Sequence, residues 1–442
     1  MKRRYIAAAA AFLLLCGCTN IEYTLPSSGT SSVQTSGEIN DEVSEEKHED
    51  ISEEKTEETS EEAVEAAVYT ELTEEEIPVT SIEDTEAEDT VPDTTSVSIV
   101  CAGDNLIHAP IYRIAHRIAD DGGYDFSPAY EHLGTLISDA DLAILNQETI
   151  ISDDFEPSTW PFFCTPADMA RDMTELGFDA FSIANNHVLD KGEAGLISTL
   201  SFWRDTYPDI PVYGAYINEE DMNDIRTLTV NGVRFAFVGF MEHTNGLYLP
   251  STSDCRITYL SDEAEMERQI RQAREIADCV IVSVHFGIEV TNTITDQQYK
   301  LSQKFADWGA DIIIGTQPHT VQSMQYLDAA DGRKAFVFYC LGNFISTMDN
   351  PLSMAEMLGC ITVTRNAADG SITLSDARAV PLVDYYDPGY TYVGVYPLEE
   401  YTRELAKTHA VSGATYEFIL RLFRENIPKE FMDDKYIDLI YG

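Results

Sequence analysis

The chain has 442 residues, of which 44% are hydrophobic, and its formal net charge is −49. This hydrophobic share is enough for the core of one large globular domain or of two ordinary ones. A charge this negative repels nucleic acid and anionic lipid headgroups, so the composition argues against DNA and RNA as partners.

The first residues predict an exported protein. Lys2, Arg3 and Arg4 precede an apolar run from residue 6 to 15, which is too short to span a bilayer and is typical of a secretory signal. The segment from Leu15 to Cys18 resembles the bacterial lipobox, so we expect residues 1–18 to be a lipoprotein signal peptide and Cys18 to be lipidated. The mature protein would then be anchored to the outer face of the bacterial cell membrane. The alternative is an ordinary signal peptide in which Cys18 is incidental.

Residues 19–95 differ in composition from the rest of the chain. They carry 25 acidic residues against Lys47 and Lys55, a net charge of −23, and comparatively few large apolar residues. Such a segment cannot bury enough surface to offset its ordering entropy, so we expect a disordered acidic stalk. A specific acidic docking tail is the alternative. With +3 from the N-terminus, the total of −49 leaves −29 for residues 97–442.

Apolar runs alternate with helical patterns from residue 96 onward. The predicted strands are 97–102, 142–145, 180–184, 226–230, 234–240, 279–284, 312–314, 335–341 and 359–364. The predicted helices are 128–139, 192–204, 261–277, 296–308 and 411–423. Asn231-Gly232 and Asp369-Gly370 are hairpin signals. The pattern indicates an α/β fold with a mixed sheet, or two sheets, covered by helices.

The cysteines do not predict a disulfide framework. Cys101, Cys279, Cys340 and Cys360 lie in apolar runs, where a buried free thiol is expected. No pair has CxxC spacing, although one disulfide stays open in an exported protein.

Polar residues recur directly after the predicted strands. They are Asp104, Asn146, Glu148, Asn185, Asn186, His187, His285, Glu289, His319 and Asn343. Each alone is explained as a turn former, a helix cap or a structural histidine. Six segments with the same placement predict one shared site, because α/β folds build sites at the carboxyl ends of strands. Carboxylate, amide and imidazole donors together suit a divalent Mn, Fe, Zn or Mg ion.

The segments that carry these residues resemble a known family. In order they are Gly103-Asp104, Asn146 to Thr149, Ala184 to Gly192, His285 to Glu289, Gly315 to Gln322 and Leu341 to Phe344, with Thr244 to Gly246 as a further match. They are similar to the CapA family of poly-γ-glutamate capsule synthesis proteins, whose domain is similar to calcineurin-like metallophosphoesterases. The resemblance implies two mixed β-sheets in a sandwich flanked by helices over residues 96–345. Residues 346–442, with hairpin strands and a helix, would be the C-terminal part of the same domain.

The resemblance also implies roles for the strand-end residues, with one or two ions bound. Asp104 and His319 would hold a first metal, Asn186 and His285 a second, and Glu148 would bridge them. His187 would act as a general acid beside the substrate. Glu289 and Gln322 would orient ligands, and Asn146, Asn185, Asn245 and Asn343 are candidates for substrate binding, although Asn343 is equally explained as a turn cap.

Two positions depart from the pattern that the resemblance implies. His108 lies four residues after Asp104, where a metallophosphoesterase usually has a ligand histidine two residues after its aspartate. It either returns to the metal through a loop or has a surface or supporting role. Gln317 stands where the family usually has a histidine, and an amide oxygen is the weaker ligand for a transition metal. We therefore expect the second metal to be held weakly or only with substrate.

Three functions remain open from the sequence. The first is the synthesis, export or anchoring of an anionic capsule or envelope polymer such as poly-γ-glutamate, with the polymer or its synthesis complex as partner. The second is a metal-dependent phosphoesterase that acts on an envelope precursor or a nucleotide. The third is a non-catalytic, metal-stabilised polymer-binding subunit within a synthesis complex. Resemblance of fold does not decide whether the chain is an enzyme.

Overall fold

The computed structural model describes residues 94–442. The predicted signal peptide, the lipidation site Cys18 and almost all of the predicted stalk lie outside the described residues. Within residues 94–442, every helix is too short or too polar to serve as a membrane span.

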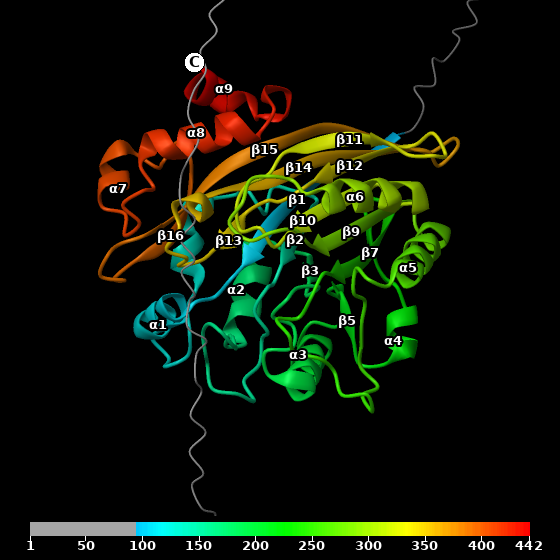
Figure 1. Cartoon of the computed structure of the whole chain (residues 1–442), viewed down its shortest axis with the longest axis horizontal. Coiled ribbons are helices and arrows are strands. Elements are labelled where there is room, and N and C mark those ends of the chain that lie inside the picture. Colours follow the sequence, from blue (N-terminus) through cyan, green and yellow to red (C-terminus); the bar gives the residue numbers. More distant parts are fainter. Residues whose placement is uncertain (1–93) are drawn as a thin grey trace, which may run out of the picture. The chain divides into compact units, whose positions relative to one another are not determined.

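The larger of the two main sheets has a parallel half and an antiparallel half (Figure 1). Its strands are β1 (Thr94–Asn105), β2 (Leu142–Asn146), β3 (Ala180–Ser182), β4 (Val212–Tyr213), β13 (Asn343–Ile345), β14 (Ala355–Asn366), β15 (Ile372–Tyr386) and β16 (Val393–Pro397). They run in the order β16-β15-β14-β1-β2-β3-β4, and β13 pairs with β1. Strands β1 to β4 are parallel, whereas β14, β15 and β16 are antiparallel to their neighbours.

The second sheet has six strands. They are β6 (Arg226–Val230), β7 (Val233–Met241), β9 (Cys279–His285), β10 (Ile312–Thr316), β11 (Met324–Asp328) and β12 (Lys334–Phe338). The order is β11-β12-β10-β9-β7-β6, with a parallel centre and an antiparallel strand at each edge. A small ribbon pairs β5 (Ala215–Tyr216) with β8 (Arg256–Ile257).

Helices lie outside the two sheets (Figure 1). The α-helices are α1 (Ala109–Ile118), α2 (Asp168–Leu176), α3 (Gly192–Thr206), α4 (Glu219–Asn223), α5 (Glu263–Ile276), α6 (Asp296–Trp308), α7 (Arg403–Lys407), α8 (Tyr416–Asn426) and α9 (Asp434–Tyr441). Three 3₁₀ helices are η1 (Ser127–Leu133), η2 (Pro351–Met354) and η3 (Lys429–Phe431).

Strand β9 shows how sheets and helices share the core. Ile281 lies in the cluster that includes Ile99 of the other sheet, whereas Val282 lies in a second cluster with Ile270 of α5 and Phe305 of α6. Successive side chains of a strand point to opposite faces, so one strand packs against a sheet on one side and against helices on the other. The predicted fold class, two mixed sheets in a sandwich flanked by helices, is confirmed.

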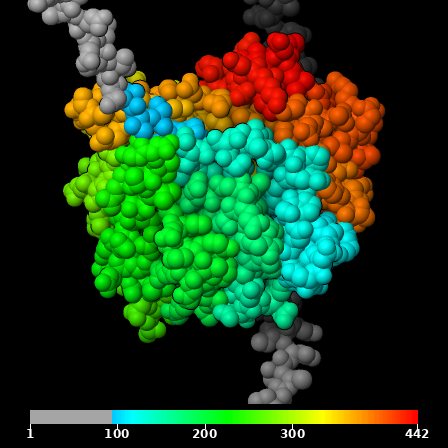
Figure 2. Space-filling view, turned by 180° about the vertical axis from the view of Figure 1, so that it is seen from behind, coloured from blue at the N-terminus to red at the C-terminus, as the bar shows by residue number. Residues whose placement is uncertain are grey.

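The C-terminal strands complete the larger sheet. Strand β14 pairs with β1 along eight residues, and β15 and β16 extend the sheet beyond it. Figure 2 shows the same association from behind: the orange and red C-terminal residues lie against the blue and cyan residues near the start of the described chain. The six cysteines of this part of the chain are all buried and unpaired, as expected for Cys101, Cys279, Cys340 and Cys360.

Several predicted boundaries were wrong, for local reasons. The helix predicted at 128–139 is the 3₁₀ helix η1, which stops before Gly134 because that residue has φ 56° and ψ −120°. The helix predicted from residue 411 begins at Tyr416, where the Thr415 side chain accepts a hydrogen bond from the Phe418 N–H. Helices α1 and α2 were not predicted.

Candidate metal centre

The carboxyl ends of the parallel strands of both sheets meet at one place. Asp104 stands near the end of β1 and pairs in register with Asn146 at the end of β2. His285 ends β9 and pairs with Thr316 at the end of β10. The polar segments that follow these strands are thereby brought together, which is the convergence that their placement predicts.

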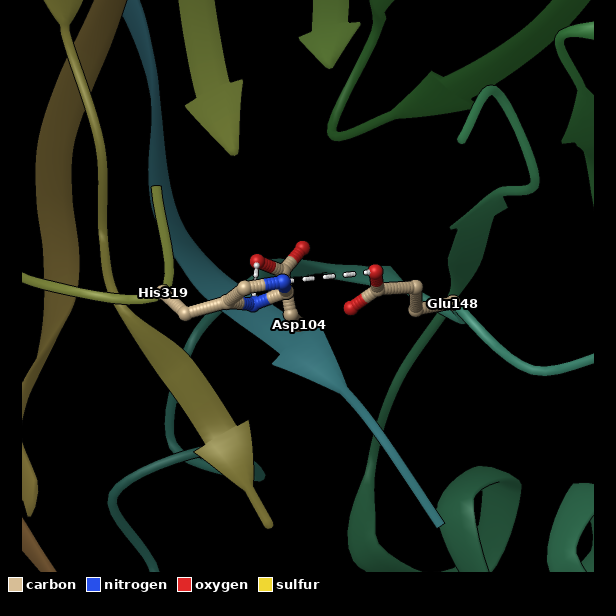
Figure 3. Close-up of side chains that lie close together, drawn as sticks. All are labelled: Asp104, Glu148 and His319. Atoms are coloured by element: carbon tan, nitrogen blue, oxygen red, sulfur yellow. Dashed lines mark ion pairs between the residues drawn. The ribbon is translucent and has the colours of Figure 1, made fainter. Parts of the chain in front are cut away.

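Asp104, Glu148 and His319 form the centre of this cluster (Figure 3). Each offers one ligand atom, and these atoms lie within 4.8 Å of one another. His319 Nδ1 is 3.0 Å from Asp104 Oδ2, and His319 Nε2 is 3.8 Å from Glu148 Oε1. All three side chains are buried, so the charges face one another rather than water.

The electrostatics of these three residues fit a bound cation. Both carboxylate oxygens of Glu148 are buried without a hydrogen-bond partner. Burial, and next the charge of Asp104, raise the pKa of Glu148 well above its usual value. Burial alone would lower the pKa of His319, but Glu148 and Asp104 outweigh it and raise that pKa to about 10. Without a cation, the negative charge of these groups is offset by protons on Glu148 and His319, whereas the pKa of Asp104 is lowered by the neighbouring His319 despite its burial. A divalent ion would take the place of these protons, since two carboxylates and an imidazole are a suitable donor set.

His285 and Asn186 lie on the other side of Glu148. His285 Nε2 is 3.2 Å from Asn186 Oδ1 and 3.6 Å from Glu148 Oε1, while its Nδ1 is 2.8 Å from Thr316 Oγ1. Burial is the main reason that the pKa of His285 falls to about 3, so this imidazole is neutral. A neutral imidazole and an amide oxygen beside one carboxylate form a second donor set next to the first.

Gln317 contributes its backbone rather than its side chain to the centre. Its N–H donates to Asp104 Oδ2 at 3.3 Å, whereas its side-chain amide donates to Glu289 Oε1 at 3.2 Å. Gln317 and His319 have φ angles of 97° and 54°, in the left-handed region that residues other than glycine rarely adopt. Strained backbone of this kind clusters at functional sites, where surrounding contacts hold it in place.

His187 lies beside the cluster and is held by an aspartate. Its Nδ1 is 2.8 Å from Asp190 Oδ2, and the same oxygen accepts a hydrogen bond from the Phe163 N–H. The Phe163 ring packs edge-on against the imidazole at 4.7 Å between centroids. Asn245 Nδ2 is 3.4 Å from His187 Nδ1, and Asn245 Oδ1 accepts from the Asn186 amide. Asp190 therefore orients the ring and leaves Nε2 available for proton transfer.

The structure places His108 next to the cluster but outside the Asp104, Glu148 and His319 group. Its Nδ1 accepts a hydrogen bond from the Thr347 N–H at 3.2 Å, and its ring packs edge-on against Phe163. Burial, and then the charge of His319, lower the pKa of His108 to about 4. Of the two roles left open by the sequence, this position favours the supporting one.

The remaining predicted residues contact the ligands or hold the loops that carry them. Asn146 Nδ2 donates to Asp104 Oδ1 at 2.6 Å, and Asn343 Oδ1 is 2.9 Å from His319 Nδ1. Asn185 accepts a hydrogen bond from the His187 N–H, which fixes that turn. Gln322 instead donates to the carbonyls of residues 291 and 293, so it holds a neighbouring loop.

Sequence reasoning missed three residues that hold the site together. Asp190 orients His187, Thr316 holds His285, and Phe163 packs on both His187 and His108. Asp190 carried a signal, since it lies three residues after His187 in the same polar segment. Phe163 carried none, because its loop joins the site only through tertiary contacts.

Comparison with known proteins identifies relatives of this chain. Residues 98–348 match the model of the family described as Bacterial capsule synthesis protein PGA_cap. The capsule biosynthesis protein CapA of Bacillus anthracis is 31% identical over 175 residues, which cover 39% of this chain and 41% of that protein. The PGA biosynthesis protein CapA of Bacillus subtilis (strain 168) is 29% identical over 181 residues, covering 41% and 46%. The match thus spans less than half the length of each relative.

Solved structures show weaker likeness. A phosphatase structure from Mycoplasma pneumoniae has 14% identity and a TM-score of 0.40, covering 67% of this chain and 97% of that one. A 5′-nucleotidase from Candida albicans has 13% identity and a TM-score of 0.36, covering 74% and 57%. The architecture of this chain therefore rests on its own strands and helices as described above.

Proposed function

The chain belongs to the PGA_cap family of bacterial capsule synthesis proteins, and on this basis we propose that it takes part in the synthesis, export or anchoring of an anionic capsule or envelope polymer such as poly-γ-glutamate. It acts through a divalent metal centre on Asp104, Glu148 and His319, with Asn186 and His285 as ligands of a second ion. Mn, Fe, Zn and Mg all suit these donors.

The observation that carries the metal centre is Glu148. A buried carboxylate with neither oxygen hydrogen-bonded is rare, because leaving such a group unpaired is expensive. Asp104 and His319 lie within ligand distance of it, so one cation would satisfy all three groups. A divalent ion supplies, when bound, Lewis-acid polarisation of an oxygen on the substrate.

The charge of the domain limits how a polyanion could bind. Residues 97–442 carry −29, so general electrostatic attraction does not capture an anionic polymer. Binding would depend on the local positive charge of a metal at the carboxyl ends of the strands. Loading with metal is therefore expected to be required for polymer binding as well as for any chemistry.

Metal content and polymer formation test this proposal. The purified protein should contain a divalent ion by elemental analysis, and Asp104→Ala should lose it. Cells that carry Asp104→Ala should make less surface polymer than cells that carry an unchanged copy at equal protein level. A metal-free wild-type protein, or full polymer production with Asp104→Ala, would contradict the proposal.

A metal-dependent phosphoesterase is the second candidate, and the His187–Asp190 pair favours it. The 2.8 Å contact between His187 Nδ1 and Asp190 Oδ2 leaves Nε2 free to protonate a leaving oxygen, a transfer worth roughly 10²–10⁴ in rate. Hydrolysis of a generic phosphodiester that is lost in His187→Ala, with metal content unchanged, would support this function. A non-catalytic polymer-binding subunit would keep polymer binding in His187→Ala and show no hydrolysis at all.

Export and lipid anchoring form a separate part of the proposal. They rest on the segment that ends in Cys18 and on the acidic stretch that follows it. Two acyl chains on Cys18 would hold the protein stably on a membrane. Cys18→Ser should release the protein from the membrane fraction, and an unchanged membrane fraction would contradict this part alone.

A further inference from the structure

A chain of buried hydrogen bonds leads from His319 into the C-terminal hairpin. His319 Nδ1 is 2.9 Å from Asn343 Oδ1, and Asn343 Nδ2 donates to Ser346 Oγ at 3.2 Å. Ser346 Oγ donates to Asp384 Oδ2 at 3.1 Å, and the Ser346 N–H donates to the same oxygen at 2.6 Å. Asp384 lies on β15, 65 residues beyond His319 in the sequence and outside the residues that match the family model.

We propose that Asp384 is a positioning residue for the candidate metal centre, and that it acts through Ser346 and Asn343 to fix the ring of His319 with Nε2 toward Glu148. This inference rests on the proposed metal centre. It gives the C-terminal hairpin a direct part in preparing a ligand.

The contacts fix the direction of every bond in the chain. The Asn343 amide nitrogen faces two acceptors, Ser346 Oγ and the Ser353 carbonyl, so its oxygen faces His319. The Ser346 hydroxyl then accepts from Asn343 and donates to Asp384. His319 Nδ1 is left between two acceptors, Asn343 Oδ1 and Asp104 Oδ2, and must carry a proton. Its Nε2, 3.8 Å from Glu148 Oε1, is therefore the nitrogen that can donate a lone pair to a metal.

The support is rigid because each member is buried and mounted on the sheet. Asn343, Ser346 and Asp384 are all buried, and Asp384 pairs in register with Val395 between two neighbouring strands. Burial raises the pKa of Asp384 to about 8. The chain of hydrogen bonds is kept in either protonation state of Asp384, since its Oδ2 accepts from Ser346 whether or not Oδ1 carries a proton.

The metal affinity of the purified full chain tests the proposal, with Zn²⁺ as the probe in isothermal titration. Loss of a group that hydrogen-bonds a ligating histidine directly typically weakens metal binding by roughly 10–100-fold. Ser346 and Asp384 act through Asn343, so we expect Ser346→Ala and Asp384→Ala to lose less, up to about 10-fold. Asp384→Asn should stay close to wild type, because its amide oxygen can still accept from Ser346. Thermal unfolding of the metal-free proteins identifies any variant that fails to fold. If Asp384→Ala does not fold, the Zn²⁺ affinity of Ser346→Ala alone tests the proposal.

Ser302→Ala is the matched control for Ser346→Ala. Ser302 is a fully buried serine on α6, and its hydroxyl has no hydrogen-bond partner. It is not a member of the hydrogen-bond chain to His319, so its removal should leave Zn²⁺ affinity unchanged.

A second readout follows His319 itself. In the Zn²⁺-loaded wild type, ¹⁵N NMR should show His319 protonated at Nδ1 and coordinated through Nε2, and Ser346→Ala should broaden or shift this signal. Wild-type affinity in folded Ser346→Ala, or equal loss in Ser302→Ala, would overturn the positioning role while leaving the metal centre intact. A wild-type protein that binds no Zn²⁺, Mn²⁺, Fe²⁺ or Mg²⁺ would refute the proposed metal centre and this inference with it.

Discussion

Replacing Glu148 with glutamine should make the metal-free protein more stable and should remove most of the stabilisation that a bound metal gives. The substitution keeps the shape of the side chain but removes a carboxyl group that is buried without a hydrogen-bond partner. Burying this carboxyl group lowers the free energy of unfolding. If Glu148 is a metal ligand, that loss is recovered only when the cation is bound. Glu148→Gln separates these two contributions.

The size of the first effect follows from the raised pKa of Glu148. Above pH 4.5 the unfolded chain releases this proton while the folded, metal-free protein keeps it, so the free energy of unfolding falls by about 1.4 kcal/mol per pH unit. The penalty at pH 7 is at most about 3 kcal/mol, the value for a proton that the folded protein keeps throughout this range. For the 349 residues from 94 to 442, an unfolding entropy of roughly 0.7 kcal/mol/K converts 3 kcal/mol into about 4 °C. Glu148→Gln should gain up to this amount at pH 7 and nothing near pH 4.5.

The second effect has a similar size and the opposite sign. A metal at 100 times its dissociation constant stabilises the wild type by about 2.7 kcal/mol, again about 4 °C, and Glu148→Gln should lose most of this shift. Thermal unfolding with EDTA and with Mn²⁺ or Zn²⁺, at pH 5 and pH 7, measures both. Asp179→Asn is the control, because Asp179 is another carboxyl whose pKa is raised by burial; it lies just before β3, is not a proposed ligand, and its replacement should keep the metal shift. A Glu148→Gln protein that is less stable in EDTA, or that keeps the full metal shift, would refute the reasoning.

Three further outcomes can be checked directly. Gln317→His should raise the number of ions bound per chain by elemental analysis, since an imidazole replaces an amide that now faces Glu289; unchanged stoichiometry would count against a weak second site. If the protein hydrolyses phosphodiesters, Asp190→Asn should lower kcat by roughly 10²–10⁴ with metal content unchanged, because His187 loses the carboxylate that orients it. Gly103→Ala should cost more than about 4 kcal/mol or prevent folding, because its Cβ would lie 2.0 Å from the Gly342 carbonyl oxygen; a soluble variant of normal melting temperature would contradict this.

The strands of the fold could be predicted from sequence because their signal is local. Parallel strands that are covered on both faces appear as short apolar runs, and the strands on which the site is built were found in this way. The helix α1 was missed although Pro110 at its first turn and the spacing of Ile111, Ile114 and Ala115 are helix signals. The run from 128 to 139 has helical spacing, but the backbone conformation of Gly134 ends the helix after one short segment.

For the candidate site, the sequence predicted which residues come together but not how their side chains are directed. Residues that follow parallel strands converge, so Asp104, Glu148, His285 and His319 could be grouped without a structure. The direction of a side chain after the strand could not be predicted. Gln317 faces Glu289 because its loop adopts a positive φ angle, which no local pattern in the sequence specifies.

Asp384 could not be predicted from the sequence for the same reason, because its contacts depend on the directions of side chains. It also lies outside the segment that matches the family model. The family match ends at residue 348, yet the β14–β15 hairpin pairs with β1, whose last residues include Asp104. A polypeptide that ended at residue 348 would expose the backbone edge of β1. It would also lack Asp384, the last acceptor in the series of hydrogen bonds that begins at His319. Asp384 touches no proposed ligand and is linked to His319 only through Ser346 and Asn343. On the proposed role of Asp384, the candidate metal centre depends on the C-terminal strands for the orientation of His319.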